Sequence, residues 1–355
     1  MKHLSDCCVD RNNNFNLLRL IGASLVIFGH SYVTYGPQGT RDWINAHIPP
    51  VSAGQLGVQI FFVISGFLVS QSFVNRPHVF EFLVARMLRI FPGLIVALAF
   101  TVLLGAWVTT LPLRDYVSDP RVHDYFFYNA VLDLRWGLPG VFLDNSFPQV
   151  VNGSLWTLPK EFALYMILMV AGAAGGFGAR AVANLVCALA VVLHLQQTGT
   201  YHLSGGDINV DSVMFCFLIG VLFFVNRDYI VVSLRVAIVA ILAAVACVKF
   251  DYHSFVALQV CIAYCVMVLA YHRWLQLPMF RKTDYSYGLY IYAFPVQQAL
   301  AQSGVVHRFG LYVLACLLLI LPLAVFSWHV VEKPAMRLRD RLRRRLTAPV
   351  AKVQT

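Results

Sequence analysis

Residues 17–35 read LLRLIGASLVIFGHSYVTY, an apolar stretch with one arginine near its start and one histidine in its second half. A helix of about 20 apolar residues is long enough to cross a hydrocarbon core of about 30 Å. The stretch has no small-residue cleavage site, so we expect it to remain in the protein as a spanning helix instead of being removed as a signal peptide.

Similar stretches follow along the whole chain of 355 residues, which is 59% hydrophobic and 12% charged. A soluble domain carries about 25% charged residues. The composition therefore excludes a soluble enzyme, a disordered chain and a secreted disulfide scaffold. It predicts an all-α polytopic membrane protein with about ten transmembrane helices, at 17–35, 54–73, 90–110, 160–177, 181–197, 211–226, 230–248, 254–271, 286–303 and 309–330.

The net charge of +10 comes from basic residues that flank the apolar stretches. With the N-terminus in the cytoplasm, 20 of the 27 Lys and Arg residues fall on the inner side and 7 on the outer side. The positive-inside rule therefore predicts that both termini are cytoplasmic. Residues 336–355 are expected to form a basic cytoplasmic tail on anionic lipid, and nucleic acid is not an expected partner.

The outward segment 110–160 is much longer than the other predicted loops. Loops longer than about 12–15 residues are usually functional or disordered, and the aromatic run 125–128 (YFFY) argues against disorder. We expect this segment to form a lid or a re-entrant element.

Two ionisable residues of the first stretch, Arg19 and His30, are a hypothesis for a functional site, because such groups are costly inside a membrane. Their spacing of eleven residues puts them on one helix face, about 16 Å apart in depth. The structural alternative is that Arg19 reaches the membrane interface and His30 bonds a neighbouring helix.

Arg86 and Arg89 lie in RMLRIFP, at the predicted end of the cytoplasmic loop 74–89 and just before Pro92. Their i, i+3 spacing places both guanidiniums on one helix face at the inner membrane boundary. Paired guanidiniums bind phosphate well, although two arginines at a helix start are also typical of simple anchoring.

The outer segment re-enters the membrane in VNGSLWTLPKEFALY. Pro159 suits a first helical turn, which would place Glu161 in that turn and on one face with Tyr165. Trp156 is expected at the membrane interface. A glutamate and a tryptophan at a helix start are also ordinary structural devices, so both interpretations stay open.

Other polar residues in or near apolar stretches carry weaker signals and are expected to be structural or solvated. They are Asp207, Asp211, Asp284, His194 and His329. No disulfide framework or metal-ligand spacing is visible, so no metal is expected.

Taken together, these segments resemble the membrane acyltransferase-3 family, whose members move acyl groups, commonly acetyl from acetyl-CoA, to sugars of envelope and exported polysaccharides. The resemblance rests on the Arg19–His30 pattern, GVQIFFVISGFL, RMLRIFP, SLWTLPKEFALY, SYGLYIYAFPV and VEKPAMRLR with Glu332. Many relatives carry a histidine before the proline of SYGLYIYAFP, where Ala293 stands here, so that position cannot be catalytic in this chain.

The resemblance implies an acyltransferase membrane domain over residues 1–335, in a bacterial inner (plasma) membrane that the chain crosses many times. It also implies an O-acetyltransferase that uses acetyl-CoA as donor and an envelope carbohydrate, or its lipid-linked precursor, as acceptor. The basic tail 336–355 would follow this domain, and we expect no esterase-like domain after the membrane part.

His30 is the expected catalytic base, because an imidazole titrates near neutral pH and this one matches the family pattern. Glu161 is expected to orient His30 or to bind the acceptor. The phosphates of the donor are expected on Arg86 and Arg89, with Arg19 nearby.

The acceptor is expected to enter from the outer face beneath the 110–160 segment, where aromatic side chains can stack on sugars. The candidate acceptor-binding residues are Trp136, Trp156 and Tyr165. Direct transfer and a covalent acyl-enzyme both remain open.

Two other classes of protein remain as alternatives. A secondary transporter or flippase for a glycan or small anion would also place charges inside the membrane. Transporter folds often show paired repeats and interrupted helices, which this sequence lacks. A non-enzymatic envelope scaffold is the third hypothesis. The composition gives no signal for an oligomeric state, because lipid-facing and protein-facing helix surfaces look alike.

Overall fold

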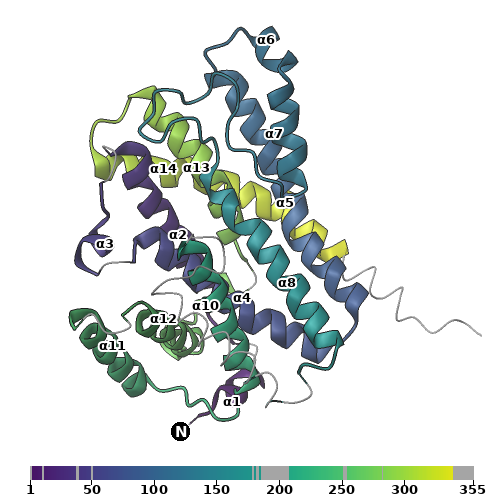
Figure 1. Cartoon of the computed structure of the whole chain (residues 1–355), viewed down its shortest axis with the longest axis vertical. Helices are drawn as coiled ribbons and strands as arrows, with labels where there is room; N and C mark the ends of the chain where they lie inside the picture. The colour runs from purple at the N-terminus through teal and green to yellow at the C-terminus, as the bar shows by residue number, and fades with distance from the viewer. Residues whose placement is uncertain are drawn as a thin grey trace, which may run out of the picture.

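The computed structural model describes residues 2–9, 12–36, 40–48, 51–177, 180, 184, 208–250, 254–281 and 283–338. Within these ranges the chain is all-helical and forms no β-strand (Figure 1). The predicted span 181–197, apart from residue 184, lies outside the described residues, as do His194, Asp207 and residues 339–355 of the predicted tail.

Each of the other nine predicted spans coincides with a helix of the described chain. These helices are α2 (Phe15–Tyr35), α4 (Ala53–Asn75), α5 (Val79–Val108), α8 (Thr157–Ala173), α10 (Ile208–Val225), α11 (Leu234–Lys249), α12 (Ser254–Ala270), α13 (Ser286–Ser303) and α14 (Phe309–Phe326). Five helical stretches in the described part are long and apolar enough to cross a membrane: α2, α4, α5, Gly153–Ala173 and Phe309–Leu338.

The predicted loop 74–89 is too long, because α4 continues to Asn75 and α5 already begins at Val79. His78 caps this helix by accepting a hydrogen bond from the backbone N–H of Glu81, which lies in the first turn, where a negative charge is favourable. Arg86 and Arg89 are therefore helical. Pro92 lies inside α5 and does not end it.

Helix α4 packs tightly between α2 and α10. A Cβ atom on Gly57 would lie 2.3 Å from the carbonyl oxygen of Gly22 in α2, and one on Gly66 would lie 2.0 Å from that of Phe217 in α10. Only glycine allows backbones to approach so closely, which is how helices associate where water supplies no driving force. These contacts fix the position and rotation of α4.

Helix α13 lies against α2, α5 and α14 and is buried along most of its length. The Gln297 amide donates to the carbonyl oxygen of Ile27 and to Ser31 Oγ, both at 2.8 Å. The Tyr312 hydroxyl of α14 donates to the carbonyl oxygen of Gln297 at 2.7 Å. Polar side chains therefore hold three apolar helices in one register.

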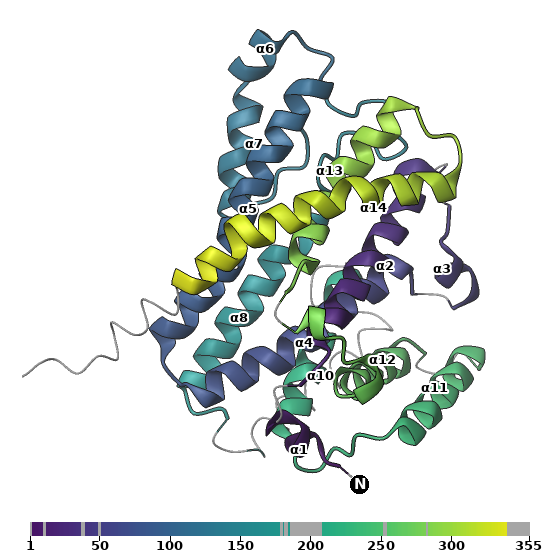
Figure 2. The same ribbon diagram turned by 180° about the vertical axis from the view of Figure 1, so that it is seen from behind.

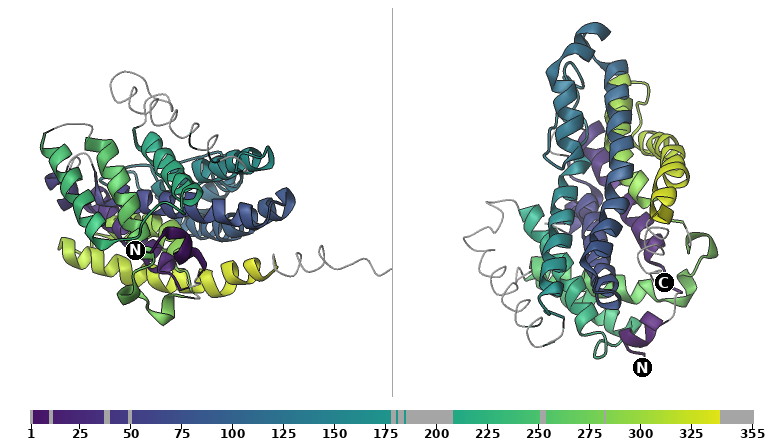
Figure 3. Two further views of the ribbon diagram at one scale, coloured as in Figure 1. Left: turned by 90° about the horizontal axis from the view of Figure 1, so that it is seen from below. Right: turned by 90° about the vertical axis from the view of Figure 1, so that its right-hand side faces the viewer.

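The segment 110–160 is ordered and contains α6 (Leu113–Ser118), α7 (Pro120–Ala130) and the short 3-10 turn η1 (Gly153–Trp156). Helix α7 packs on α5, and α6 and α7 lie at the opposite end of the molecule from α1 (Leu4–Val9), as Figures 1 and 3 show. The Gln298 amide donates to the carbonyl oxygens of Phe147 and Val150, which ties this segment to α13.

Helix α14 runs obliquely across the back of the molecule and continues into the π-helical turn η4 (Ser327–Glu332), as Figure 2 shows. This turn lies against α5. The end of the described chain is thus brought next to the helix that carries Arg86 and Arg89.

Candidate active site

A cavity of about 330 Å³ lies between α2, α4, α5, α8 and the start of α13. We call it the arginine cavity, because four guanidiniums line it against two carboxylates. These charged residues are Arg19, Arg86, Arg89, Arg281, Glu161 and Asp284. The excess of positive charge and the fork-shaped donors of arginine suit an anionic ligand such as a phosphate.

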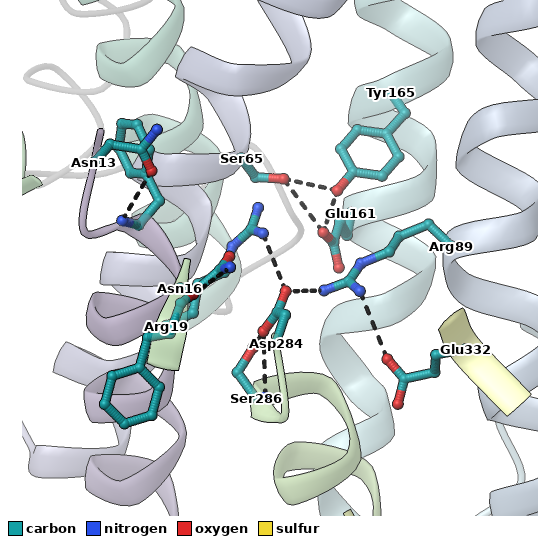
Figure 4. Close-up of polar contacts among 12 residues, drawn as sticks. Asn13, Asn16, Arg19, Ser65, Arg89, Glu161, Tyr165, Asp284, Ser286 and Glu332 are labelled. Atoms are coloured by element: carbon teal, nitrogen blue, oxygen red, sulfur yellow. Dashed lines mark hydrogen bonds and ion pairs between the residues drawn. The ribbon is translucent and has the colours of Figure 1, made fainter. Parts of the chain in front are cut away.

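Asp284 joins two of these arginines, as Figure 4 shows. Its Oδ2 atom lies 2.6 Å from Arg89 Nη2 and 3.3 Å from Arg19 Nη1, while its Oδ1 atom accepts a hydrogen bond from the Ser286 hydroxyl. Asp284 itself is only 5% exposed. One buried carboxylate thus positions guanidiniums from α2 and α5.

The charge of Asp284 is maintained by these neighbours. Burial raises the pKa of the carboxyl, but the guanidiniums of Arg89 and Arg19 lower it more, so the pKa lies below its ordinary value. Asp284 is therefore ionised near neutral pH, and both arginines keep a charged partner.

Arg89 has a second acidic neighbour, because its Nη1 atom lies 3.5 Å from Oε2 of Glu332 in η4. Glu332 is buried and its other oxygen accepts a hydrogen bond from Ser327 at 2.9 Å. The Arg89 guanidinium also lies 5.7 Å from the centre of the Tyr287 ring. Of the two arginines labelled in Figure 4, Arg89 therefore has more partners than Arg19.

Glu161 lies on α8 at the same cavity and accepts hydrogen bonds from the hydroxyls of Tyr165 and Ser65. The predicted shared face of Glu161 and Tyr165 is confirmed by this bond. Glu161 lies in the second turn of α8 and not in the first, because the helix begins at Thr157. The Arg86 guanidinium lies 5.5 Å from the centre of the Tyr165 ring, so the cluster borders the arginines.

A second cavity of about 630 Å³ contains His30, and we call it the histidine cavity. Its walls come from α2, α4, η1, the 110–160 segment and the segment around α3 (Trp43–His47). Trp136 and Trp156 line it together with Tyr32 and Arg41. Aromatic rings with polar groups between them are a suitable lining for a carbohydrate.

The imidazole of His30 packs edge-on against the ring of Phe294, with 5.1 Å between ring centres. Its Nδ1 atom is buried and has no hydrogen-bond partner among the described residues. Phe294 follows the fully buried Ala293, so the SYGLYIYAFP segment lies beside His30 even though it supplies no second histidine.

The two cavities share helices α2 and α4 and the chain around the start of α8. Helix α2 contributes Arg19 to the arginine cavity and His30 to the histidine cavity, and the chain around the start of α8 contributes Thr157 to the first and Trp156 to the second. Successive turns of α4 line one cavity and then the other, and Val58 lines both. The two cavities therefore lie end to end.

The predicted site residues fall into two groups. The arginine cavity brings together Arg19, Arg86, Arg89, Glu161 and Tyr165, and the histidine cavity brings together His30, Trp136 and Trp156. The structure does not bring the predicted pair Glu161 and His30 together, since Glu161 bonds Tyr165 and Ser65 in the other cavity. Nor does Tyr165 lie beside the tryptophans.

Sequence reasoning missed Asp284, which was expected to be structural or solvated. Its two arginine partners lie 265 and 195 residues away in the chain, so no local spacing reveals them. The only signal in the sequence was an acidic residue beside an apolar stretch, in a chain that also has arginines within or at the ends of its apolar stretches.

Within the described ranges, no group of three or more His, Cys, Asp or Glu side chains is arranged to hold a metal ion. The seven cysteines described there are all free thiols.

Comparisons with known proteins identify the family of the chain. The family model described as "Acyltransferase domain" matches residues 12–329. The chain is 29% identical over 350 residues to an "O-acetyl transferase" of Shigella phage Sf6, a match that covers 91% of this chain and 96% of the relative. It is 28% identical over 362 residues to "Nodulation protein 10" of Rhizobium leguminosarum bv. viciae, covering 93% and 95%. No solved structure gives a significant match. The match along nearly the whole chain establishes that this all-helical protein is an acyltransferase of the acyltransferase-3 family.

Proposed function

We propose that the protein is an O-acetyltransferase of the bacterial inner membrane. It transfers an acetyl group from acetyl-CoA to a hydroxyl of an envelope or exported polysaccharide, or of its lipid-linked precursor. The observation that carries this proposal is the end-to-end arrangement of a cavity rich in guanidinium groups and a cavity that contains an imidazole and two tryptophans. The relative named "O-acetyl transferase" supports the type of reaction.

The proposed orientation places the arginine cavity at the cytoplasmic side, where acyl-CoA is made. Ten spans and two cytoplasmic termini, over a membrane domain of residues 1–335, are the topology that the basic residues favour. The 110–160 segment then lies outside and covers the histidine cavity, which it lines with Trp136 and Phe147. The tail 336–355 would lie on the inner lipid surface.

The arginine cavity fits the phosphate groups of acetyl-CoA. Arg86 and Arg89 lie three residues apart on α5, and Arg19 is joined to Arg89 through Asp284. Guanidiniums held in this way can donate paired hydrogen bonds to phosphate oxygens without first losing much side-chain freedom. Acetyl-CoA would supply the acyl group as a thioester.

The histidine cavity would hold the acceptor, with Trp136 and Trp156 stacking on its sugar rings. His30 would take the proton from the acceptor hydroxyl as the new carbon–oxygen bond forms and would return a proton to the departing sulfur. The acyl carbon thus exchanges a bond to sulfur for a bond to oxygen, and the hydroxyl proton ends on the thiol. The free Nδ1 atom of His30 leaves the imidazole without a carboxylate partner from the described chain. Glu161 and Tyr165 would border the donor.

The test uses purified protein in lipid vesicles with acetyl-CoA labelled in the acetyl group and the polysaccharide of the host envelope as acceptor. The expected result is label bound covalently to the carbohydrate and released as acetate by mild base. A parallel assay uses carbohydrate that is itself radiolabelled, with unlabelled acetyl-CoA. Movement of this carbohydrate across the vesicle membrane without acetylation would support the transporter or flippase alternative and would refute the proposal.

His30→Gln should lower transfer by about 100- to 10,000-fold, the range for loss of a general base, while binding of CoA to the arginine cavity is retained. His47→Gln is the matched control, because His47 is exposed and does not line the histidine cavity. Full transfer by His30→Gln would contradict the proposed role of the imidazole.

A further inference from the structure

One face of α4 lines the two cavities in succession. Gly54, Gln55 and Val58 border the histidine cavity, and Val58, Phe61 and Ser65 border the arginine cavity. Spacings of three and four residues keep these positions on one helix face. Val58 is the one residue among those described that lines both cavities, so it lies where they meet.

The residues of α4 that follow Val58 along the wall of the arginine cavity are apolar. Phe61 and Phe62, about one turn further along α4, separate it from Ser65 and the charged groups around Glu161. A phosphate that entered this part would lose its hydration without gaining a partner, whereas a neutral acyl-thioester arm would not. The junction thus favours passage of the acyl end of the donor alone.

The backbone that carries Val58 has little freedom to move away. Its neighbour Gly57 packs against α2, where a Cβ atom would lie 2.3 Å from the carbonyl oxygen of Gly22, and Gly66 packs as closely on α10. Val58 is only 6% exposed and lines both cavities, so its side chain lies at the junction and does not point into lipid. The size of side chain 58 therefore sets the width of the opening.

We propose that Val58 is the gate between the arginine and histidine cavities and that its size limits which acyl group reaches His30. This inference rests on the proposed function. An acetyl group passes the valine side chain, and longer acyl groups such as butyryl are held back by it.

The test compares acetyl-CoA and butyryl-CoA as donors for the purified protein in vesicles. Val58→Ala removes two methyl groups from the junction, and the ratio of kcat/KM for butyryl-CoA to that for acetyl-CoA should rise roughly tenfold or more, as for other pockets that select by one or two carbon atoms. Val58→Phe should lower transfer from acetyl-CoA by about 100-fold, because the thioester can no longer reach its reactive position. Binding of CoA should stay within about twofold of wild type in the Phe variant, since the guanidiniums keep their positions.

Val69→Ala is the matched control, because Val69 lies on the same helix, is 1% exposed and lines neither cavity. It removes the same two methyl groups from α4 and should leave the donor ratio unchanged. An unchanged donor ratio in Val58→Ala, or an equal rise in Val69→Ala, would refute the proposed gate. Neither result would contradict the proposed transferase function. Failure of the wild-type protein to transfer any acyl group would refute the proposed function itself.

Discussion

Replacing Asp284 by Asn should expose a repulsion that the carboxylate now neutralises. The guanidinium nitrogens of Arg89 and Arg19 lie 2.6 and 3.3 Å from the same oxygen atom, so they are at most about 6 Å apart. Two positive charges at that distance repel by about 3 kcal/mol at an effective dielectric constant of about 20. The Asn side chain keeps the shape of the aspartate but removes the charge that compensates both arginines.

The full cost depends on how far the arginines can reach water. Both guanidinium side chains are 20% exposed, and Arg89 keeps Glu332 at 3.5 Å. We therefore expect a loss of about 2–3 kcal/mol, at or below the lower end of the 3–5 kcal/mol that follows from breaking a buried ion pair. Arg19 loses the one carboxylate that the described chain gives it.

The assay is thermal unfolding of the purified protein in detergent, with and without CoA. Asp284→Asn should unfold at a lower temperature than wild type. Adding Arg19→Gln should restore part of the loss, because one of the two repelling charges is then gone. CoA should raise the unfolding temperature of Asp284→Asn by more than that of wild type, since phosphates replace the missing negative charge.

Two results would refute this reasoning. Wild-type stability of Asp284→Asn would mean that the ion pairs do not position the arginines. The second result concerns the double variant. If Arg19→Gln lowers the unfolding temperature of Asp284→Asn by as much as it lowers that of wild type, the two residues do not interact.

Three further predictions concern the donor site, the acceptor site and the pH dependence of the Asp284 contribution. Arg86→Ala should raise the KM for acetyl-CoA by roughly 10- to 100-fold, the effect of losing a hydrogen bond to a charged group. Arg76→Ala is the control, because Arg76 is exposed and lies outside the cavity, and it should leave this KM unchanged. An equal effect of both substitutions would indicate only a general charge effect. Trp136→Ala and Trp156→Ala should raise the KM for the carbohydrate and change the KM for acetyl-CoA little, because both rings line the histidine cavity. A rise in the KM for acetyl-CoA alone would contradict this assignment. The arginines hold the pKa of Asp284 below its ordinary value, so its stabilising contribution is present above the unfolded-state pKa of about 4 and is lost as the pH falls through the lower folded-state value. The difference in unfolding temperature between wild type and Asp284→Asn should accordingly be constant from about pH 8 to about pH 5 and should shrink below about pH 4; a difference that shrinks near pH 7 would contradict the pKa direction.

The helices were predictable because their signal is local. An apolar stretch of spanning length is visible in any window of the sequence, and nine predicted positions carry helices in the described part of the chain. The start of α5 was predicted wrongly, because residues 79–89 include three charged side chains and were therefore left out of the membrane span. His78 and Glu81 nevertheless form an ordinary helix start.

The candidate site was predictable only in its parts. Arg19, Arg86 and Arg89 were predicted to act together, and all three line one cavity. The predicted contact between Glu161 and His30 is absent. His30 lies in α2 and Glu161 in α8, and which side chains of two helices meet depends on tertiary packing that the sequence does not show. Asp284 was missed for the same reason, because its partners come from distant parts of the chain.

The most direct test is a cryo-electron microscopy structure of the protein with CoA bound. We expect the phosphates beside Arg86 and Arg89 in the arginine cavity, and the thiol end directed past Val58 toward His30. A nucleotide bound in the histidine cavity, or a thiol end directed away from His30, would contradict the assignment of the two cavities to donor and acceptor.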